Sequence, residues 1–176
     1  MTPAKIPSFE DISQIVYNGL VRLEVTGGLP TWEAMPGALH QGVVDDIRQA
    51  ITRLNIDNTT CGCYHIADTY IQFGLNLLRR PDIAIFCERP PRPDGALTGI
   101  IPGAVIEILS AGYEQKDRDA IPFYLAAGVI DIVLVDPRAN SAEHHTIGNP
   151  ATIHSLPVTW RLGMGCILEI PGINLS

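Results

Sequence analysis

The chain contains 176 residues, of which 46% are hydrophobic and 18% are charged, so wholesale disorder is excluded and a globular fold is expected. Its 12 Lys and Arg against 19 Asp and Glu give a formal net charge of −7. This balance argues against a general affinity for phosphate backbones, although it allows a local basic cleft. The length predicts a single domain, residues 1–176, with a core that needs neither a disulfide nor a metal.

The N-terminal segment lacks the apolar core of a signal peptide, and no stretch is apolar enough to cross a membrane. We therefore expect a cytoplasmic protein that makes no membrane contact. In the reducing cytoplasm, the four cysteines are expected to be free thiols.

The first part of the chain predicts two helices separated by a loop. Ser8 to Asp11 resembles a capping box, and apolar residues then follow helical spacing, which predicts a helix over residues 8–23. The glycines and prolines of residues 25–39 predict a loop. A single apolar stripe predicts a second helix over residues 39–54.

The remaining sequence favours strands around one further helix. Apolar or β-branched runs predict strands at 63–73, 82–87, 103–109 and 130–135, and antiparallel strands near 142–147, 151–155 and 166–170. The proline-rich residues 89–95 predict an exposed loop, and Asp136-Pro137 predicts a strand-ending turn.

A short helix is predicted over residues 118–127. It should begin near Asp117 or Asp119, because Pro122 fits best in a first helical turn, and Gly128 should end it. The order of elements predicts an α/β fold with a mixed central sheet flanked by helices, plus extra antiparallel strands.

Two carboxylates stand out because they belong to apolar strands. Asp82 opens one strand and Glu107 lies inside another. Taken singly, Asp82 is a strand-end cap and Glu107 is half of a buried ion pair. Taken together, two adjacent strands could bring both acids to one hard cation, with the Ile108 carbonyl as a third ligand. Mg²⁺ suits such a site, and Mn²⁺ could replace it.

Lysine is scarce in this chain, which contains only Lys5 and Lys116. Lys116 comes nine residues after Glu107, in the predicted loop before the next helix. It could supply an ammonium group to the carboxylate site. Alternatively, it is a solvated loop lysine that pairs with Glu114 and Asp117 at the surface.

The sequence at this point resembles a known family. The motifs that carry the resemblance occur in order along nearly the whole chain: Arg80-Pro-Asp82-Ile-Ala-Ile, Val105-Ile-Glu107-Ile-Leu-Ser110, Asp117, Tyr124-Leu-Ala-Ala-Gly-Val129 and Val135-Asp-Pro137. They are similar to the Uma-type family of restriction endonucleases, within the PD-(D/E)XK nuclease superfamily. Glu24 before a glycine, and His40 at the start of the second predicted helix, also resemble that family.

The resemblance implies a Mg²⁺-dependent endonuclease that hydrolyses DNA phosphodiester bonds. Asp82 and Glu107 would hold one or two metal ions, and Lys116 would position the attacking water or offset developing charge. Glu24 and His40 would be outer contacts, with Glu24 supplied by the first predicted helix. Arg80 or Arg118 could bind a phosphate. Many such nucleases act as homodimers, which we also expect here.

The sequence departs from the family pattern in its lysine and its charge. The superfamily lysine usually lies two residues after the glutamate, where this chain has Leu109. The family often moves that lysine one turn before the tyrosine, where this chain has Ala120. These departures and the −7 charge favour an alternative, in which the chain is a catalytically inactive relative that acts as a binding or assembly subunit.

Other side chains offer weaker candidates. Cys61, Cys63 and His65 alternate, so on a strand they would share one face and could form a zinc site with Cys87. His144-His145 is expected to be a surface pair. Trp32 and Tyr113 could stack on a base, but loop aromatics more often pack on their own domain.

Overall fold

The computed structural model describes residues 21–54 and 61–173. Its centre is a six-stranded mixed sheet with the order β12-β11-β10-β9-β7-β4. Strands β9 and β10 are parallel and the other neighbouring pairs are antiparallel. The strand bounds are β4 (Tyr64–Ala67), β7 (Ile83–Phe86), β9 (Ala104–Ile108), β10 (Asp131–Asp136), β11 (Ser141–Thr146) and β12 (Thr152–Ser155).

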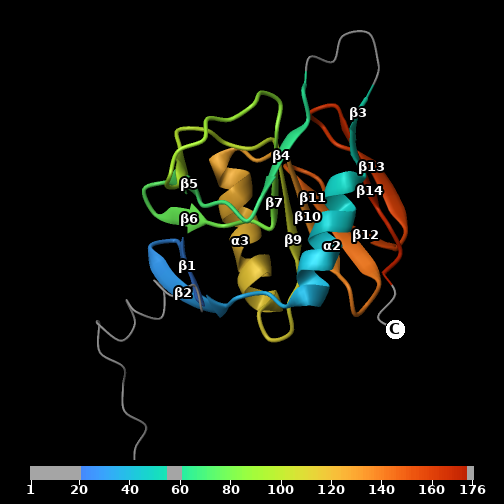
Figure 1. Ribbon diagram of the computed structural model, residues 1–176, viewed down its shortest axis with the longest axis horizontal. Helices are drawn as coiled ribbons and strands as arrows, with labels where there is room; N and C mark the ends of the chain where they lie inside the picture. The colour runs from blue at the N-terminus through green and yellow to red at the C-terminus, as the bar shows by residue number, and fades with distance from the viewer. Residues whose placement is uncertain (1–20, 55–60, 174–176) are drawn as a thin grey trace, which may run out of the picture.

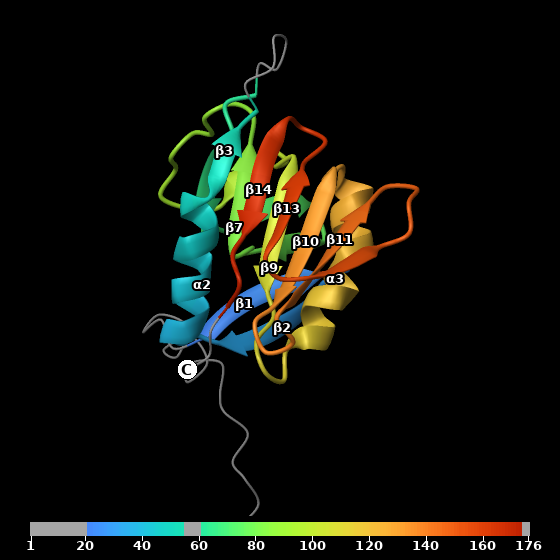
Figure 2. The same cartoon turned by 90° about the vertical axis from the view of Figure 1, so that its right-hand side faces the viewer.

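Among the described residues, one helix covers each face of this sheet, with the central strands running between the two helices (Figures 1 and 2). Helix α2 (Ala38–Gln49) packs Val43, Val44 and Ile47 on one face, and α3 (Glu114–Ala127) packs Ala120 and Tyr124 on the other. Alternate residues of a strand point to opposite faces. Strands β7, β9 and β10 are apolar throughout, apart from a few carboxylates, because both of their faces are buried.

Two smaller sheets flank the central one. A five-stranded sheet has the order β2-β1-β6-β5-β8, with β1 (Val21–Thr26), β2 (Leu29–Ala34), β5 (Ile71–Gly74), β6 (Leu77–Arg79) and β8 (Leu97–Thr98). A three-stranded sheet has the order β13-β14-β3, with β13 (Val158–Arg161), β14 (Cys166–Ile170) and β3 (Ile51–Arg53). The first contacts α3 through β5 and the second contacts α2 through β14.

The predicted α/β fold with a mixed central sheet is confirmed, but the N-terminal predictions are partly wrong. Most of the helix predicted over 8–23 lies outside the described residues, and residues 21–23 belong to strand β1. The loop predicted over 25–39 contains β2 and the start of α2. Gly27 and Gly28, with φ of 60° and 82°, form the two-residue turn of a β1–β2 hairpin. Such turns need positive φ, so the glycines mark a hairpin rather than a loop.

Both predicted helices in the described residues have wrong boundaries. Helix α2 ends at Gln49, and the next residues form β3, where Ile51 and Thr52 pair with β14. Helix α3 begins at Glu114, earlier than predicted, so Pro122 lies in its interior. Pro122 is on the exposed side, where water can replace a lost backbone hydrogen bond. Gly128 ends α3 as predicted, with φ of 100°.

The predicted strands at 82–87, 103–109, 130–135, 142–147, 151–155 and 166–170 are confirmed as β7, β9, β10, β11, β12 and β14. The segment 63–73 divides into two strands, β4 and β5. The loop at 89–95 is confirmed. Asp136 accepts hydrogen bonds from the backbone N–H groups of Arg138 and Ala139, which confirms the predicted turn.

The expectation of free thiols is wrong for this structure. Disulfides join Cys61 to Cys87 and Cys63 to Cys166, so none of the four cysteines is free. Sequence spacing could not show this, because the fold brings together residues 26 and 103 positions apart. Within the described residues, no helix has both the length and the apolar character that a membrane span requires.

Candidate active site

Asp82 and Glu107 lie side by side at the start of β7 and near the end of β9. The two strands are antiparallel with Ile83 opposite Ile106, so Asp82 comes opposite Glu107. The Asp82 backbone N–H donates to Glu107 Oε2 at 3.2 Å, and the Ile108 N–H donates to Asp82 Oδ2 at 2.8 Å. Each residue is only 4% exposed. The structure therefore brings both acids into one buried site on neighbouring strands.

His40 completes the environment of Asp82. It lies in the first turn of α2, and its Nε2 is 3.0 Å from Asp82 Oδ2 and 3.1 Å from the Ile108 carbonyl oxygen. Burial opposes the charged imidazolium, but the hydrogen bond to Asp82 and the charge of that acid outweigh it, so the pKa of His40 is raised. On the other side, Arg22 Nη1 lies 3.3 Å from Asp82 Oδ1.

Glu107 is paired with Arg79, a residue that the sequence analysis did not select. The Arg79 guanidinium is fully buried and reaches Glu24 at 3.0 Å, Asp117 at 3.1 Å and Glu107 at 3.5 Å. The Tyr124 hydroxyl donates to Glu107 Oε1 at 2.6 Å and accepts from Arg79 Nε at 3.2 Å. A buried cation thus stands directly beside Glu107.

Lys116 joins the same network from further out. It lies in the first turn of α3 rather than in a loop, because the helix begins earlier than predicted. Its Nζ is 2.5 Å from Glu33, 2.8 Å from Glu24 and 3.2 Å from Asp117 Oδ1. The Asp117 Oδ1 atom also contacts Arg79, so Lys116 is linked to Glu107 through Asp117 and Arg79.

The other predicted site residues fall into two groups. Glu24 belongs to the cluster, but it comes from strand β1 and not from a helix, and its Oε1 accepts from the Arg80 N–H at 2.7 Å. The Arg80 guanidinium instead binds Asp68 at 2.8 Å. Arg118 pairs with Glu143 of β11 at 2.6 Å, so the structure does not bring Arg118 into the carboxylate cluster.

Burial and neighbouring charges shift the pKa values of the acids in this cluster in different directions. Burial and the nearby Asp117 raise the pKa of Glu107 to about 8, against the opposing effect of Arg79. Burial also raises the pKa of Asp117 to about 6, although Lys116 and Arg79 act in the other direction. For Asp82, burial is outweighed by the hydrogen bond and charge of His40, so its pKa is lowered. The environment therefore favours the protonated form of Glu107 and the ionised form of Asp82.

Comparison with known proteins gives the family of the chain and a structure with a similar fold. The model of the Uma2 family, described as "Putative restriction endonuclease", matches residues 9–166. The chain belongs to the Uma2 family. Among solved structures, it is similar to "a putative nuclease belonging to DUF820" from Anabaena variabilis, with a TM-score of 0.59 and 19% identity over 86% of each chain. That likeness supports the fold. A search of curated proteins found no match.

The two positions where family members are expected to carry a lysine are apolar and buried in this Uma2 chain. Leu109 is 3% exposed and Ala120 is 0% exposed, and both pack with Tyr124 in the core on the α3 side. Arg79 of β6 touches both the Tyr124 hydroxyl and Glu107, so a guanidinium stands beside Glu107 although neither of these two positions carries a lysine.

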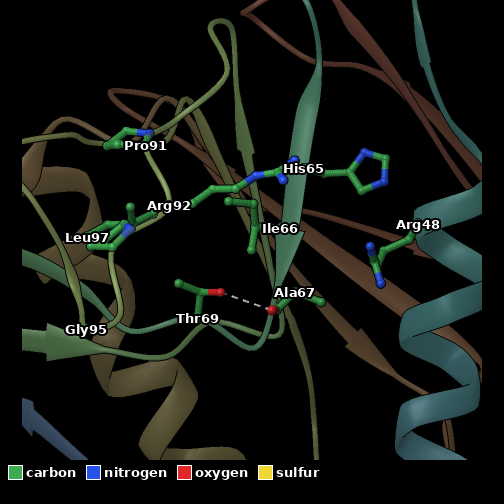
Figure 3. Close-up of a pocket in the computed structure, with 10 residues that line it drawn as sticks. Arg48, His65, Ile66, Ala67, Thr69, Pro91, Arg92, Gly95 and Leu97 are labelled. Carbon is green, nitrogen blue, oxygen red and sulfur yellow. Dashed lines mark hydrogen bonds between the residues drawn. The ribbon is translucent and has the colours of Figure 1, made fainter.

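A pocket lies beside this site, next to the first turn of α2. This pocket, of about 250 Å³, is lined by His40, the Ile108–Ala111 segment and Arg138, among others. His40 and Ile108 both contact Asp82, which does not itself line the pocket, so the pocket ends beside that acid. A second pocket, of about 410 Å³, lies along β4 and is lined by Arg48, His65 and Arg92 (Figure 3). It includes neither carboxylate.

Several residues of this network of buried acids and bases were not selected by the sequence analysis. Arg22, Glu33 and Asp68 come from strands or turns whose pairing the sequence did not predict. Arg79 had a usable signal, because adjacent residues of a strand point to opposite faces and one of Arg79 and Arg80 must therefore face inward.

The remaining candidates lie elsewhere. The surface position expected for the histidine pair is wrong, since His144 binds Asp131 at 2.8 Å and packs on Trp160, and both side chains are mostly buried. Trp32 lies on β2 and is 42% exposed. The Tyr113 hydroxyl accepts from the Ala34 N–H at 3.5 Å.

Proposed function

We propose that this Uma2 family member is a Mg²⁺-dependent endonuclease that hydrolyses DNA phosphodiester bonds at Asp82, Glu107 and the Ile108 carbonyl. The observation that carries the proposal is the meeting of these groups on neighbouring strands beside His40, at the end of a solvent pocket. Family membership supports a nuclease activity.

The groups around Asp82 fit a small divalent cation. Asp82 offers a carboxylate and Ile108 a carbonyl, and such oxygens are the ligands that Mg²⁺ prefers. The His40 Nε2 atom contacts both, at 3.0 Å from Asp82 Oδ2 and 3.1 Å from the Ile108 oxygen, so these two oxygens converge on one point. Asp82 and the Ile108 carbonyl would hold Mg²⁺ or Mn²⁺, with Glu107 as the second carboxylate. The metal would supply Lewis acidity to a phosphoryl oxygen.

Each remaining residue of the cluster has a separate role in this proposal. Glu107, whose pKa is about 8, would release its proton when a cation binds beside it. Arg79 would hold Glu107 in place and offset its charge, in place of the family lysine. Lys116 would hold Glu24 and Asp117 around Arg79. His40 would orient Asp82 and protect its ionised state.

The substrate would approach through the pocket beside His40. Ser110 and Arg138 line it and offer a hydroxyl and a guanidinium to a phosphate. Cutting both strands of a duplex requires two such sites, and for this reason we also propose a homodimer.

The decisive experiment compares plasmid cleavage by the native chain with that by Asp82→Asn and Glu107→Gln, in Mg²⁺ or Mn²⁺. Loss of either carboxylate should reduce cleavage by about 100-fold or more, because several kcal/mol of charge stabilisation depend on the metal. Glu169→Gln is a matched control, since that acid is exposed on β14. Excess chelator should abolish cleavage. Equal cleavage by the native chain and Glu107→Gln would refute the proposal.

One observation favours the alternative of an inactive relative that binds or assembles. Arg22 and Arg79 already pair with Asp82 and Glu107, which reduces the local negative charge available to a metal. Calorimetric titration with Mn²⁺ separates the two functions. Binding that disappears in Asp82→Asn would support the enzyme, whereas the absence of both binding and cleavage would support the alternative.

A further inference from the structure

The four cysteines converge from three separate segments of the chain. Cys61 and Cys63 come just before β4, Cys87 directly follows β7, and Cys166 begins β14. Disulfides pair them as Cys61–Cys87 and Cys63–Cys166, and the Cys61 and Cys166 Sγ atoms lie 3.8 Å apart across the two pairs. We call this group the sulfur cluster. It contains every cysteine of the chain.

Backbone contacts hold these segments together independently of the sulfur–sulfur bonds. The Gly62 N–H donates to the Cys87 carbonyl at 2.7 Å, and a Cβ on Gly62 would lie only 2.8 Å from that oxygen. Only glycine therefore fits between the two cysteines here. Arg53 of β3 pairs with Cys166 in the sheet and donates from Nε to the Cys61 carbonyl at 3.1 Å. The side chains would remain close together after reduction.

The spacing of the sulfur atoms suits a tetrahedral thiolate site. With Zn–S bonds of about 2.3 Å, the sulfurs of a tetrahedral zinc site lie about 3.8 Å apart. The Sγ atoms of Cys61, Cys63 and Cys166 all lie within 4.8 Å of one another, and Cys61 and Cys166 are at 3.8 Å. Neither Cys87 nor His65 is part of this group of three, but the Cys87 sulfur is bonded directly to that of Cys61, which leaves Cys87 rather than His65 as the fourth candidate ligand.

From these contacts we propose that, once its disulfides are reduced, the chain binds one Zn²⁺ through Cys61, Cys63, Cys87 and Cys166. The site is distinct from the Mg²⁺ site proposed at Asp82, which lies at the opposite end of β7. Bound zinc would tie the edge of the central sheet at β4 and β7 to strand β14. In a reducing cytoplasm, thiols are the expected form of cysteine, so zinc would replace the disulfides there.

The chemistry of the exchange balances with a phosphine as reductant. Each disulfide accepts two electrons from one trialkylphosphine, which takes the oxygen of a water molecule, and the two sulfurs become thiols. Binding of Zn²⁺ then releases four protons as the four thiols become thiolates. Cys87 is exposed, so the reductant can reach the Cys61–Cys87 bond first.

Titration of the reduced full-length chain with Co²⁺ tests the proposal, because tetrahedral cobalt thiolates give characteristic charge-transfer bands. We expect saturation at one Co²⁺ per chain, displacement by Zn²⁺, and protection of all four thiols from a thiol reagent. Circular dichroism in the same samples reports whether the fold survives reduction. Four thiols that stay reactive with equimolar Zn²⁺, and no thiolate bands with Co²⁺, would overturn the proposal. So would a fold that is lost on reduction and not restored by Zn²⁺.

Two variants make the assignment specific. Cys87→Ser removes an exposed ligand with little effect on the core, and it should lose the tetrathiolate spectrum and bind Zn²⁺ more weakly than the native chain. Asp82→Asn should keep the full spectrum, because Asp82 belongs to the other site. An unchanged spectrum and affinity in Cys87→Ser would contradict the four-cysteine site.

Discussion

Strand β7 begins directly after Asp82 and ends directly before Cys87, and its two ends are stabilised in different ways. At the Asp82 end, buried acids and bases form a non-covalent cluster in which most groups have two or more partners. At the Cys87 end, sulfur atoms are joined covalently and surrounded mainly by apolar residues.

The difference shows how each end should respond to substitution. Removing one member of a buried charge cluster leaves other buried charges without a partner in the folded state. Removing a disulfide acts mainly by giving freedom back to the unfolded chain. The charge cluster should therefore be more sensitive to single substitutions and to pH, and the sulfur cluster to loop length and redox conditions.

The largest effect is expected for Arg79→Met. This substitution leaves Glu24, Glu107 and Asp117 buried without their shared guanidinium, so the free energy of unfolding should fall by about 3–5 kcal/mol. Urea unfolding measures the change. Arg138→Met is the matched control, because Arg138 is 41% exposed and pairs with Glu114 at the surface, where loss of an ion pair costs about 1 kcal/mol or less. Similar losses in both variants would contradict the buried network.

The second largest effect is expected for the pH dependence of stability, which should change when Glu107 is replaced. The folded state holds a proton on Glu107 up to about pH 8, whereas the unfolded carboxyl releases it near its ordinary pKa of 4.5. Between these values the folded state binds more protons, so stability falls as pH rises. The stability lost between about pH 5 and pH 8 should therefore be greater in the native chain than in Glu107→Gln.

Thermal unfolding from pH 5 to pH 8, with chelator present, measures this difference. Titration of Asp117 also lowers the stability as the pH rises to about 6, but it does so in both the native chain and Glu107→Gln. Melting temperatures that differ by a constant amount at every pH would show that Glu107 does not titrate in this range.

The smallest effect is expected for the difference between the two disulfides in their contribution to stability. Cys63–Cys166 closes a separation of 103 residues and Cys61–Cys87 one of 26. In the chain-entropy model, the longer loop adds about 1 kcal/mol of stabilisation. The oxidised double variant Cys63→Ala, Cys166→Ala should therefore be about that much less stable than Cys61→Ala, Cys87→Ala, measured by urea unfolding without metal. The opposite order would show that native-state packing outweighs loop entropy.

The central sheet could be predicted from sequence because its strands are apolar runs buried on both faces. The β1–β2 hairpin could not, because Leu23 of β1 also fits the helical spacing predicted over residues 8–23, and the Gly27-Gly28 turn has the composition of a loop. Strand β3 was not predicted for a similar reason. Ile51 continues the apolar spacing of the preceding helix, although its backbone pairs with β14.

Only the two central carboxylates of the site could be brought together from the sequence. Asp82 directly precedes one apolar strand and Glu107 lies inside another, so a shared site could be predicted on the condition that the two strands are neighbours. Which acids the cations would contact could not be predicted, because Arg22 and Arg79 reach Asp82 and Glu107 from a different sheet. The cysteine pairing likewise depends on tertiary contacts between distant segments.

The ion pairs of this fold also bear on how a polyanion would bind. In the described part of the chain, seven basic residues already have a carboxylate partner: Arg22, Arg48, Arg79, Arg80, Lys116, Arg118 and Arg138. Salt sensitivity of nucleic-acid binding comes from counterions released when free cations meet phosphates. Apart from Arg138, whose exposed ion pair can be exchanged for a phosphate, these cations would form few phosphate contacts. The affinity of this protein for DNA should therefore depend only weakly on ionic strength.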